Sequence, residues 1–502
     1  MPSNASLTLT IIERATRAAV RTAIVSHEGT FAYGDLLDVS GRIAGVLLDG
    51  HPDLGEARIC FHLPPGFAHI AVQWGIWRAG GIAVPLAISH PPPELEYVVR
   101  DAEARVIISG GGGEETCRAI AAATGARFLP VHELLSAASP PSLPAVDASR
   151  RAMMVYTSGT TGRPKGVVTT HANIVAQIES LVSAWGWTAD DRILLVLPLH
   201  HVHGIVNVVA CALWSGATIE APPHFDVEET WRSIASGRLT LFMAVPTIYR
   251  KLIAAFETAD TGRRRAMRDG CQGVRLMVSG SAALPVQMLE RWREITGHTL
   301  LERYGMTEMG MALSNPLVGE RRPGFVGVPV PGVQVRLVDD AGRPVPEGEA
   351  GEVEVRGANV FSEYWRRPEA TAEAFRDGWF RTGDTAVVER GSYRLLGRSS
   401  VDILKTGGYK VSALEIEELL REHPAIAECA VVGVEDADWG ERVSVAVEVR
   451  GEAIVTLDAL KAWAKDRLAP YKVPRDLRVV AALPRNAMGK VVKSEVLKLF
   501  RD

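Results

Sequence analysis

Short apolar runs alternate with longer helical patterns along most of the chain. The runs cover 105–108, 152–156, 193–197, 239–245 and 274–278, and they are rich in Val, Ile and Leu. Apolar runs of this length between helical stretches are typical of parallel strands that are buried on both faces. The pattern therefore predicts a large body of α/β layers.

The pattern changes after about residue 320. Short strand-like runs with Gly and Pro turns follow, as in 332–338 and 351–355, and they predict a smaller β-rich part attached to the body. We therefore predict an α/β fold class with two domains. The large domain covers 1–398 and is β-rich from about 320, and a small, mobile α+β domain covers 399–502.

The C-terminal segment carries its own helix and strand signals. Ser412 and Glu415 have the spacing of a capping box, which predicts a helix that begins there. Strand-like runs cover 429–434 and 442–449, and another helix is expected to begin near Thr456. These signals support a separate small α+β unit.

Composition and charge narrow the classes of partner. The chain has 502 residues, of which 47% are hydrophobic and 23% charged, so a globular protein is expected rather than a disordered one. A net charge of −4 gives no overall attraction for nucleic acid or for an anionic membrane. The longest apolar segment, 205–214, is short and contains Asn207, which predicts a buried segment. Small molecules are the expected partners, and the oligomeric state stays open.

Cysteine usage and the N-terminal pattern bear on the compartment. The five cysteines form no CxxC pair, which disfavours a disulfide framework and a structural zinc site. No charged segment followed by an apolar one marks a secretion signal. Arg14, Arg17 and Arg21 leave a mitochondrial transit peptide open, but Glu13 interrupts them, and 9–25 is explained equally well by an amphipathic helix that enters a strand. The expected location is the cytoplasm.

The segment 156–166 concentrates groups that bind phosphate. Its candidate ligands are Thr157, Ser158, Gly159, Thr160, Thr161 and Lys165. Glycines let backbone N–H groups approach a polyanion, hydroxyls donate hydrogen bonds, and lysine supplies charge. The GxxxxGK[ST] spacing of a Walker A loop is absent. A solvated Ser/Thr-Gly turn is the alternative, and the length of the ordered pattern disfavours it.

The same segment resembles the phosphate-binding signature of the adenylate-forming superfamily. That superfamily includes acyl-CoA synthetases, firefly luciferase and the adenylation domains of peptide synthetases. Further matches follow in the order of the family, at 197–204, 303–308, 382–384, 397–398, 405–410 and 484–490. Within the superfamily the chain looks most like malonyl-CoA synthetases, through the stretches 242–249, 276–285 and 301–314.

The resemblance implies an ATP site in the large domain. It assigns the ribose hydroxyls to Asp384, assisted by Arg398, and the two faces of the adenine to Tyr304 and to the 280–282 turn. The full set of expected ATP contacts outside the phosphate segment is Gly280, Ser281, Ala282, Glu302, Tyr304, Gly305, Thr307, Asp384 and Arg398. Glu308 would hold Mg²⁺ on the ATP phosphates, with Thr160 as a second ligand, because a hard cation prefers oxygen.

The resemblance also assigns the chemical groups. Lys490 resembles the lysine that stabilises the transition state when a carboxylate attacks the α-phosphorus of ATP and pyrophosphate leaves. His201 is the expected gate to the carboxylate site. Its neighbours His200 and His203 raise the possibility of a metal site, but no carboxylate or cysteine stands beside them at ligand spacing.

A rotation of the small domain is expected between two half-reactions. Gly407, Gly408 and Lys410 would then line the channel for the CoA arm. The usual hinge residue of the family has no clean counterpart, because this chain has one extra residue before Gly408. Ser399 or Ser400 would occupy the pivot, with Asp402 nearby.

Malonate requires a cation for its second carboxylate, since a buried carboxylate without a partner is costly. The candidates are Arg250, Lys251, Arg275 and Arg303, and the prediction is Lys251, two positions after Tyr249. Ser281 is a neutral donor, and Met306 lines the same site.

The predicted function is an ATP-dependent malonate:CoA ligase, which forms malonyl-adenylate and then malonyl-CoA and AMP. ATP, Mg²⁺ and CoA are the expected cofactors and co-substrates. A ligase for methylmalonate or a short monocarboxylate is the first alternative. A non-catalytic nucleotide-binding relative is the second.

Overall fold

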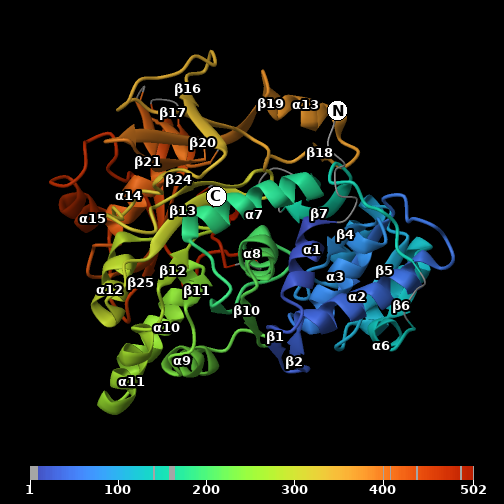
Figure 1. The fold of residues 1–502 in the computed structure, drawn as a ribbon. Coiled ribbons are helices and arrows are strands. Elements are labelled where there is room, and N and C mark those ends of the chain that lie inside the picture. The colour runs from blue at the N-terminus through green and yellow to red at the C-terminus, as the bar shows by residue number, and fades with distance from the viewer. Residues whose placement is uncertain are drawn as a thin grey trace.

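The computed structural model describes residues 9–138, 142–157, 164–398, 401–406, 409–436, 439–486 and 489–500, and of Lys410 the backbone alone. Figure 1 shows the blue and cyan N-terminal layers on the right, the green and yellow layers beside them, and the orange and red C-terminal elements at the upper left. Helices and sheets alternate in layers, which confirms the predicted α/β class.

The central sheet has the strand order β15-β14-β13-β12-β11-β9-β10-β1-β2. Its strands are β1 (Thr22–Ser26), β2 (Gly29–Ala32), β9 (Arg192–Leu194), β10 (Thr218–Ala221), β11 (Leu241–Ala244), β12 (Leu276–Ser279), β13 (Leu301–Met306), β14 (Gly310–Ser314) and β15 (Val328–Pro329). The strands from β13 to β1 pair in parallel, and β2, β14 and β15 pair antiparallel at the two edges. Every residue of β11 and β12 is buried, as their apolar runs predict.

The N-terminal sheet has the order β18-β8-β7-β4-β3-β5-β6. Its strands are β3 (Arg58–His62), β4 (Ile82–Pro85), β5 (Val106–Ser109), β6 (Arg127–Pro130), β7 (Arg151–Thr157), β8 (Lys165–Thr170) and β18 (Glu363–Tyr364). β7 and β8 form an antiparallel hairpin in which Thr157 pairs with Lys165. The predicted phosphate segment therefore begins and ends on paired strands, while 158–163 lie outside the described residues.

Helices cover and separate these sheets. They are α1 (Thr10–Arg17), α2 (Tyr33–Leu48), α3 (Phe67–Arg78), α4 (Pro92–Asp101), α5 (Glu114–Thr124), α6 (Val131–Leu135), α7 (His171–Trp185), α8 (Cys211–Ser215), α9 (Val227–Ala235), α10 (Pro246–Thr258), α11 (Thr261–Cys271) and α12 (Val286–Thr296). α1 buries Ile11, Ile12 and Ala15 and leads towards β1, as the amphipathic pattern predicts. Arg14 belongs to this packing, because its Nε donates to the carbonyl oxygen of Trp214 at 2.8 Å.

The apolar segment 205–214 is buried throughout. It runs through a π-helical turn (His203–Ala210) into α8. No helix in the described part of the chain is long and apolar enough to cross a membrane. The cysteines are free and buried.

A β-rich part follows the central sheet, as predicted. It consists of β16 (Val333–Val338), β17 (Gly351–Gly357), α13 (Pro368–Glu373), β19 (Phe375–Arg376), β20 (Trp379–Glu389) and β21 (Ser392–Arg398). The antiparallel pairing of β20 with β21 sets Asp384 opposite Arg398. The strand register thus brings Asp384 and Arg398 together. Both residues are far in sequence from the phosphate segment.

The C-terminal segment forms a further sheet with its own core. The elements are β22 (Ile403–Thr406), β23 (Tyr409–Ser412), α14 (Ala413–Leu420), β24 (Ile426–Asp436), β25 (Gly440–Val449), α15 (Leu457–Ala464), β26 (Asp476–Val479) and α16 (Lys493–Lys498). Ser412 and Thr456 cap α14 and α15, as predicted. Glu415 forms an ion pair with Lys472 at 2.6 Å instead of completing the capping box. Its core is distinct from those of the preceding sheets, but the domain division at 398 stays a prediction.

Candidate functional site

Arg303 lies in the centre of the candidate site, on the buried strand β13. Its side chain is 4% exposed, and burial lowers the pKa of its guanidinium to about 9. A Cβ atom at Gly280 would lie 2.4 Å from the Arg303 Cζ, so only glycine lets the guanidinium pass beneath the loop after β12. Among the residues that the structure describes, neither Nε nor Nη2 of Arg303 has a hydrogen-bond partner.

The loop after β12 meets the histidine segment beside Arg303. Ser281 has a left-handed backbone with φ of 69°, and its Oγ lies 3.2 Å from Nδ1 of His203. Burial, followed by the charge of Arg303, lowers the pKa of His203 well below its ordinary value. Burial and then the charge of Lys490 lower the pKa of His201 to about 4. Both imidazoles are therefore neutral at pH 7.

The histidines do not form a metal centre in the described part of the chain, where no group of three His, Cys, Asp or Glu side chains is arranged to hold an ion. The rings of His200 and His201 lie 4.2 Å apart between centroids. Gly204 allows this tight turn, because a Cβ atom there would meet the carbonyl oxygen of Pro198 at 2.4 Å. The Nε2 atoms of His201 and His203 have no partner among the described residues.

Lys490 reaches the same place from the C-terminal segment. Its pKa is lowered, first by desolvation and then by the charges of Arg398 and Arg303, and Asp384 opposes this. A Cβ atom at the preceding Gly489 would lie 3.5 Å from Cγ2 of Thr247 in α10. The structure thus brings Lys490 to Arg303 and the large body.

The predicted ribose contacts form one hydrogen-bonded unit. Asp384 accepts a hydrogen bond from the Tyr304 hydroxyl at 2.6 Å, and Nε of Arg398 lies 3.3 Å from its other carboxylate oxygen. The Tyr304 ring is buried, so its hydroxyl ties β13 to β20. The prediction that Tyr304 stacks on adenine stays a prediction.

Glu308 forms the opposite end of the site. The Tyr364 hydroxyl donates to Oε1 of Glu308 at 3.0 Å, and Nζ of Lys165 lies 4.7 Å from the centroid of the Tyr364 ring. Burial raises the pKa of Glu308, although the Tyr364 hydrogen bond and the charges of Arg398 and Lys165 act against it. Sequence reasoning missed Tyr364, which stands in β18 outside every recognised motif.

Glu302, a predicted ATP contact, supports the loop after β12, and its contact with ATP stays a prediction. Its Oε1 accepts a hydrogen bond from the backbone N–H of Leu284 at 3.0 Å, and burial raises its pKa to about 8. The side chain therefore holds the loop after β12 from beneath. The other predicted residues of this region stand along the loop and β13, namely Ala282, Gly305, Met306 and Thr307. The predicted Ser158, Gly159, Thr160, Thr161, Ser399, Ser400, Gly407 and Gly408 lie outside the described residues, as does the Lys410 side chain.

The assignment of Lys251 or Arg250 as the malonate-binding cation stays a prediction, and the structure does not favour it. Both side chains are exposed on α10, and Nζ of Lys251 lies 5.6 Å from the centroid of the Phe225 ring. Tyr249 takes the buried face of that helix and donates to the carbonyl oxygen of Val278. Arg275 is committed elsewhere, in an ion pair with Asp191 at 2.6 Å. Arg303 is the candidate cation that is buried in the site.

Comparison with known proteins agrees with this geometry. A model of the AMP-binding enzyme family matches residues 11–365, and a model of the AMP-binding enzyme C-terminal domain matches residues 415–490. The chain belongs to the AMP-binding enzyme family. The resemblance to the adenylate-forming superfamily is thereby confirmed.

Individual relatives of this AMP-binding enzyme match it over nearly its whole length. The mitochondrial malonate–CoA ligase ACSF3 of Xenopus laevis is 45% identical over 539 residues, which cover 99% of this chain and 93% of the relative. A malonate–CoA ligase of Arabidopsis thaliana is 40% identical, over 97% of this chain and 88% of the relative. The crystal structure of ATP-bound MatB from Rhodopseudomonas palustris has a TM-score of 0.91 at 33% identity and covers 98% of this chain and 99% of its own.

The expected cytoplasmic location is contradicted by the same comparison. The Xenopus relative and its mouse, human and cattle counterparts, at 44–46% identity, are all named as mitochondrial. The arginines near the N-terminus fit a transit peptide and an amphipathic first helix alike, so the sequence pattern does not distinguish the two.

Proposed function

We propose that this AMP-binding enzyme is an ATP-dependent malonate–CoA ligase that works through malonyl-adenylate. The observation that carries the proposal is a group of buried polar atoms without partners among the described residues: the donors Nε and Nη2 of Arg303, and the Nε2 atoms of His201 and His203. Buried polar groups are normally paired, so this group needs an anionic, hydrogen-bonding ligand. The relatives named as malonate–CoA ligases support the choice of acid.

Arg303 suits the second carboxylate of malonate in both charge and shape. Nε and Nη2 of a guanidinium present parallel N–H groups that fit the two oxygens of one carboxylate. The two carboxylates of malonate are separated by a single methylene, so the cation that binds one must stand close to the groups that activate the other. The charge of Arg303 acts on Lys490, which meets this requirement.

The positive groups around Lys490 favour the adenylation step. Arg398 and Arg303 repel Lys490, and the entry of the anionic ATP and acid offsets this repulsion. In the first half-reaction one malonate oxygen attacks the α-phosphorus, and the bond from that phosphorus to pyrophosphate breaks. The Lys490 ammonium stabilises the charge on the phosphoryl oxygens. His201 and His203 are neutral, so each offers a hydrogen bond to the acid only in the tautomer that carries the proton on Nε2, and neither protonates the carboxylate that attacks.

Glu308 fits a role in binding Mg²⁺ with the nucleotide. It is a half-buried carboxylate that accepts from the Tyr364 hydroxyl and feels the charges of Arg398 and Lys165, and a hard cation would stabilise its ionised form. Because the described residues offer no three-ligand cage, the ion would be held by Glu308 together with ATP phosphates. When bound, Mg²⁺ neutralises charge on the phosphates; Lys165 and the Tyr364 hydroxyl orient that end of the site.

The second half-reaction requires the loop that carries Lys490, here called the lysine loop, to leave the site. The CoA thiol attacks the acyl carbon of malonyl-adenylate, and AMP departs with the electrons of the broken bond. We place the pivot after Arg398, since the segment beyond it has a separate core. Asp402 spans this point, because its carboxylate accepts from the Arg398 backbone N–H at 3.0 Å.

A panel of acids tests the proposal. Pyrophosphate release would be measured with acetate, butyrate, malonate, methylmalonate and succinate, with and without CoA. We expect malonate to give the highest kcat/KM, and AMP and malonyl-CoA to form in equal amounts. Release with a monocarboxylate at a higher kcat/KM than with malonate would overturn the choice of acid. No release with any acid would overturn ligase activity.

A further inference from the structure

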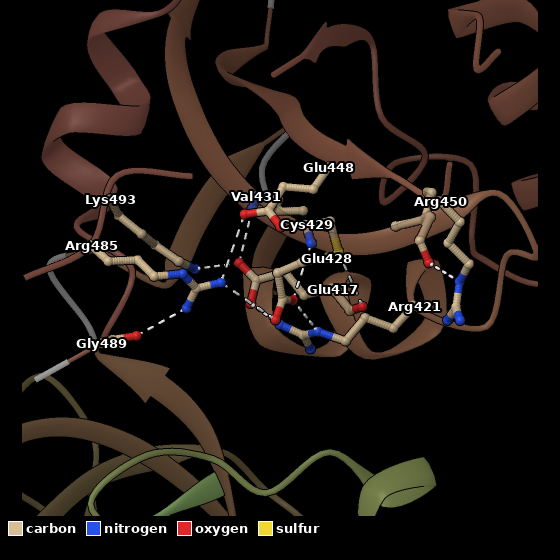
Figure 2. A network of polar contacts seen from close by, with 11 residues as sticks. Glu417, Arg421, Glu428, Cys429, Val431, Glu448, Arg450, Arg485, Gly489 and Lys493 are labelled. Carbon is tan, nitrogen blue, oxygen red and sulfur yellow. Dashed lines mark hydrogen bonds and ion pairs between the residues drawn. The ribbon is translucent and has the colours of Figure 1, made fainter. Parts of the chain in front are cut away.

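The loop that carries Lys490 is fixed by hydrogen bonds to its backbone. The N–H of Lys490 donates to Oδ1 of Asn486 at 3.0 Å, and its carbonyl oxygen accepts from the Asn486 backbone at 2.9 Å. Figure 2 shows the Arg485 side chain reaching the carbonyl oxygen of Gly489, to which Nη1 donates at 2.9 Å. The peptide unit that enters Lys490 is therefore held on both sides.

The other side of the Arg485 guanidinium faces two carboxylates of the sheet. Its Nη2 lies 3.8 Å from Oε2 of Glu428 and 3.8 Å from Oε1 of Glu448. Arg421 in turn donates to Oε1 of Glu428 at 2.7 Å. Burial alone would raise the pKa of Glu428, but Arg421 lowers it below its ordinary value, so the carboxylate is ionised. Nη2 makes no hydrogen bond with a described residue, so these two ion pairs hold the guanidinium beside β24 and β25 by charge, while Nη1 holds Gly489.

The loop is anchored after Lys490 as well. Nζ of Lys493 lies 2.8 Å from Oε1 of Glu417 and 2.5 Å from Oδ1 of Asp402. In Figure 2 Lys493 and Arg485 lie next to each other and reach Glu417 and Glu428 from the same side. Between Arg485 and Lys493, Gly489 has a left-handed backbone with φ of 76°, and glycine has few steric limits on its backbone angles. The Arg485 contact therefore restricts a peptide unit that glycine would otherwise leave free to turn.

We propose that Arg485 is a positioning residue that aims Lys490 at the reacting phosphorus by holding the carbonyl oxygen of Gly489. The inference rests on the proposed adenylation chemistry. Arg485 itself touches no substrate group in this arrangement. Its effect passes through Lys490, so it matters in the adenylation step and not in the thiolation step.

A purely structural role would give a different result. If Arg485 only stabilised the C-terminal sheet, its loss would lower the melting temperature and impair both half-reactions. Arg450 provides the matched control, since its Nε donates to one backbone carbonyl, that of Ile426, at 2.9 Å on the same sheet. Arg450 stands away from the lysine loop in Figure 2.

The experiment measures both half-reactions in Arg485→Ala, Arg485→Lys and Arg450→Ala. For Arg485→Ala we expect kcat for malonate-dependent pyrophosphate release to fall about 10- to 30-fold, because a misaimed catalytic group is costly. KM for ATP and malonate should change less than about twofold, and thiolation of supplied malonyl-adenylate should be unchanged. Arg485→Lys should recover part of the loss, since it keeps the charge but not the two-sided contact. Arg450→Ala should match the wild type.

The double variant Arg485→Ala/Lys490→Ala gives the decisive measurement. If Arg485 acts through Lys490, the double variant should release pyrophosphate no more slowly than Lys490→Ala alone. Additive losses would overturn the inference, and so would equal losses in both half-reactions of Arg485→Ala. If Arg485→Ala does not fold, the same comparison with Arg485→Lys decides. A wild-type enzyme without pyrophosphate release would overturn the proposed function, which is a separate outcome.

Discussion

The two cations at the centre of the site are held in opposite ways. Arg303 is 4% exposed on an interior strand of the central sheet, where burial fixes it and lowers its pKa. Lys490 stands on a turn between β26 and α16, keeps an exposed surface, and is held through backbone contacts to Arg485 and Asn486. The proposed function accounts for this difference: a group that binds in both half-reactions suits the core, and a group that acts in one suits a loop that can depart.

The largest effect should come from removing the departing cation. Lys490→Ala is expected to slow malonate-dependent pyrophosphate release by about 10²–10³, or about 3–4 kcal/mol, because a positioned charge is lost from the transition state. Thiolation of supplied malonyl-adenylate should stay near the wild-type rate. Rapid-quench assays of the two half-reactions check this. Equal losses in both would mean that Lys490 does not leave the site.

Removing the fixed cation should change substrate choice. Arg303→Met leaves the second carboxylate of malonate buried without a partner, which typically costs about 2–5 kcal/mol. We expect kcat/KM for malonate to fall at least about 30-fold, while that for butyrate holds or rises. KM for ATP should barely change. An unchanged malonate-to-butyrate ratio would show that another group binds the second carboxylate; thermal melting of the variant is the control for folding.

The chain predicts its strands and motifs better than the contacts among them. The runs around 241–244 and 276–279 are apolar at every position, so they predict buried parallel strands whatever the rest of the fold. The ribose pair depends instead on the register of β20 with β21. Tyr364 meets Glu308 only because β18 adds to the edge of the N-terminal sheet. Nothing local to Tyr364 carries that information.

The exposure of Lys251 follows from the sequence pattern of its helix. Apolar positions 248, 249, 252 and 256 define one face of α10, and 250 and 251 fall on the other. This pattern disfavours Lys251 as the partner of a buried carboxylate, whereas the resemblance of its position to a cation in related synthetases favours it. Arg303 lacked such a local argument, because a short strand does not reveal which of its side chains meets a neighbouring loop.

The titration of Glu302, the neighbour of Arg303 on β13, reports whether water reaches this side of the site. Its folded pKa of about 8 lies above the ordinary value of 4.5, so the folded state holds a proton that the unfolded state releases. Stability should therefore fall as pH rises from about 4.5 through about 8. Glu302→Gln keeps the acceptor for the Leu284 N–H and cannot ionise. Between pH 6 and pH 9 the melting temperature of Glu302→Gln should drop less than that of the wild type, and the difference between the two drops should be about 2–4 °C.

The control for that measurement is Glu294→Gln, which alters an exposed glutamate on α12. Its melting temperature should follow the wild type across the same pH range. If Glu302→Gln also follows the wild type, water reaches β13, and the contrast between a buried Arg303 and an exposed lysine loop would weaken.

The smallest effect is expected at Lys251, an exposed cation that serves as a comparison for the buried Arg303. Lys251 is exposed on α10, and its Nζ lies 5.6 Å from the centroid of the Phe225 ring, a contact worth at most about 1 kcal/mol at an exposed position. Lys251→Met should therefore leave kcat/KM for malonate within about twofold of the wild type, and the malonate-to-butyrate ratio should not move. The same acid panel measures it beside Arg303→Met. A selective loss with malonate would mean that α10 turns Lys251 inward when the acid binds, and the second carboxylate would then be held by a surface cation and not by a buried one.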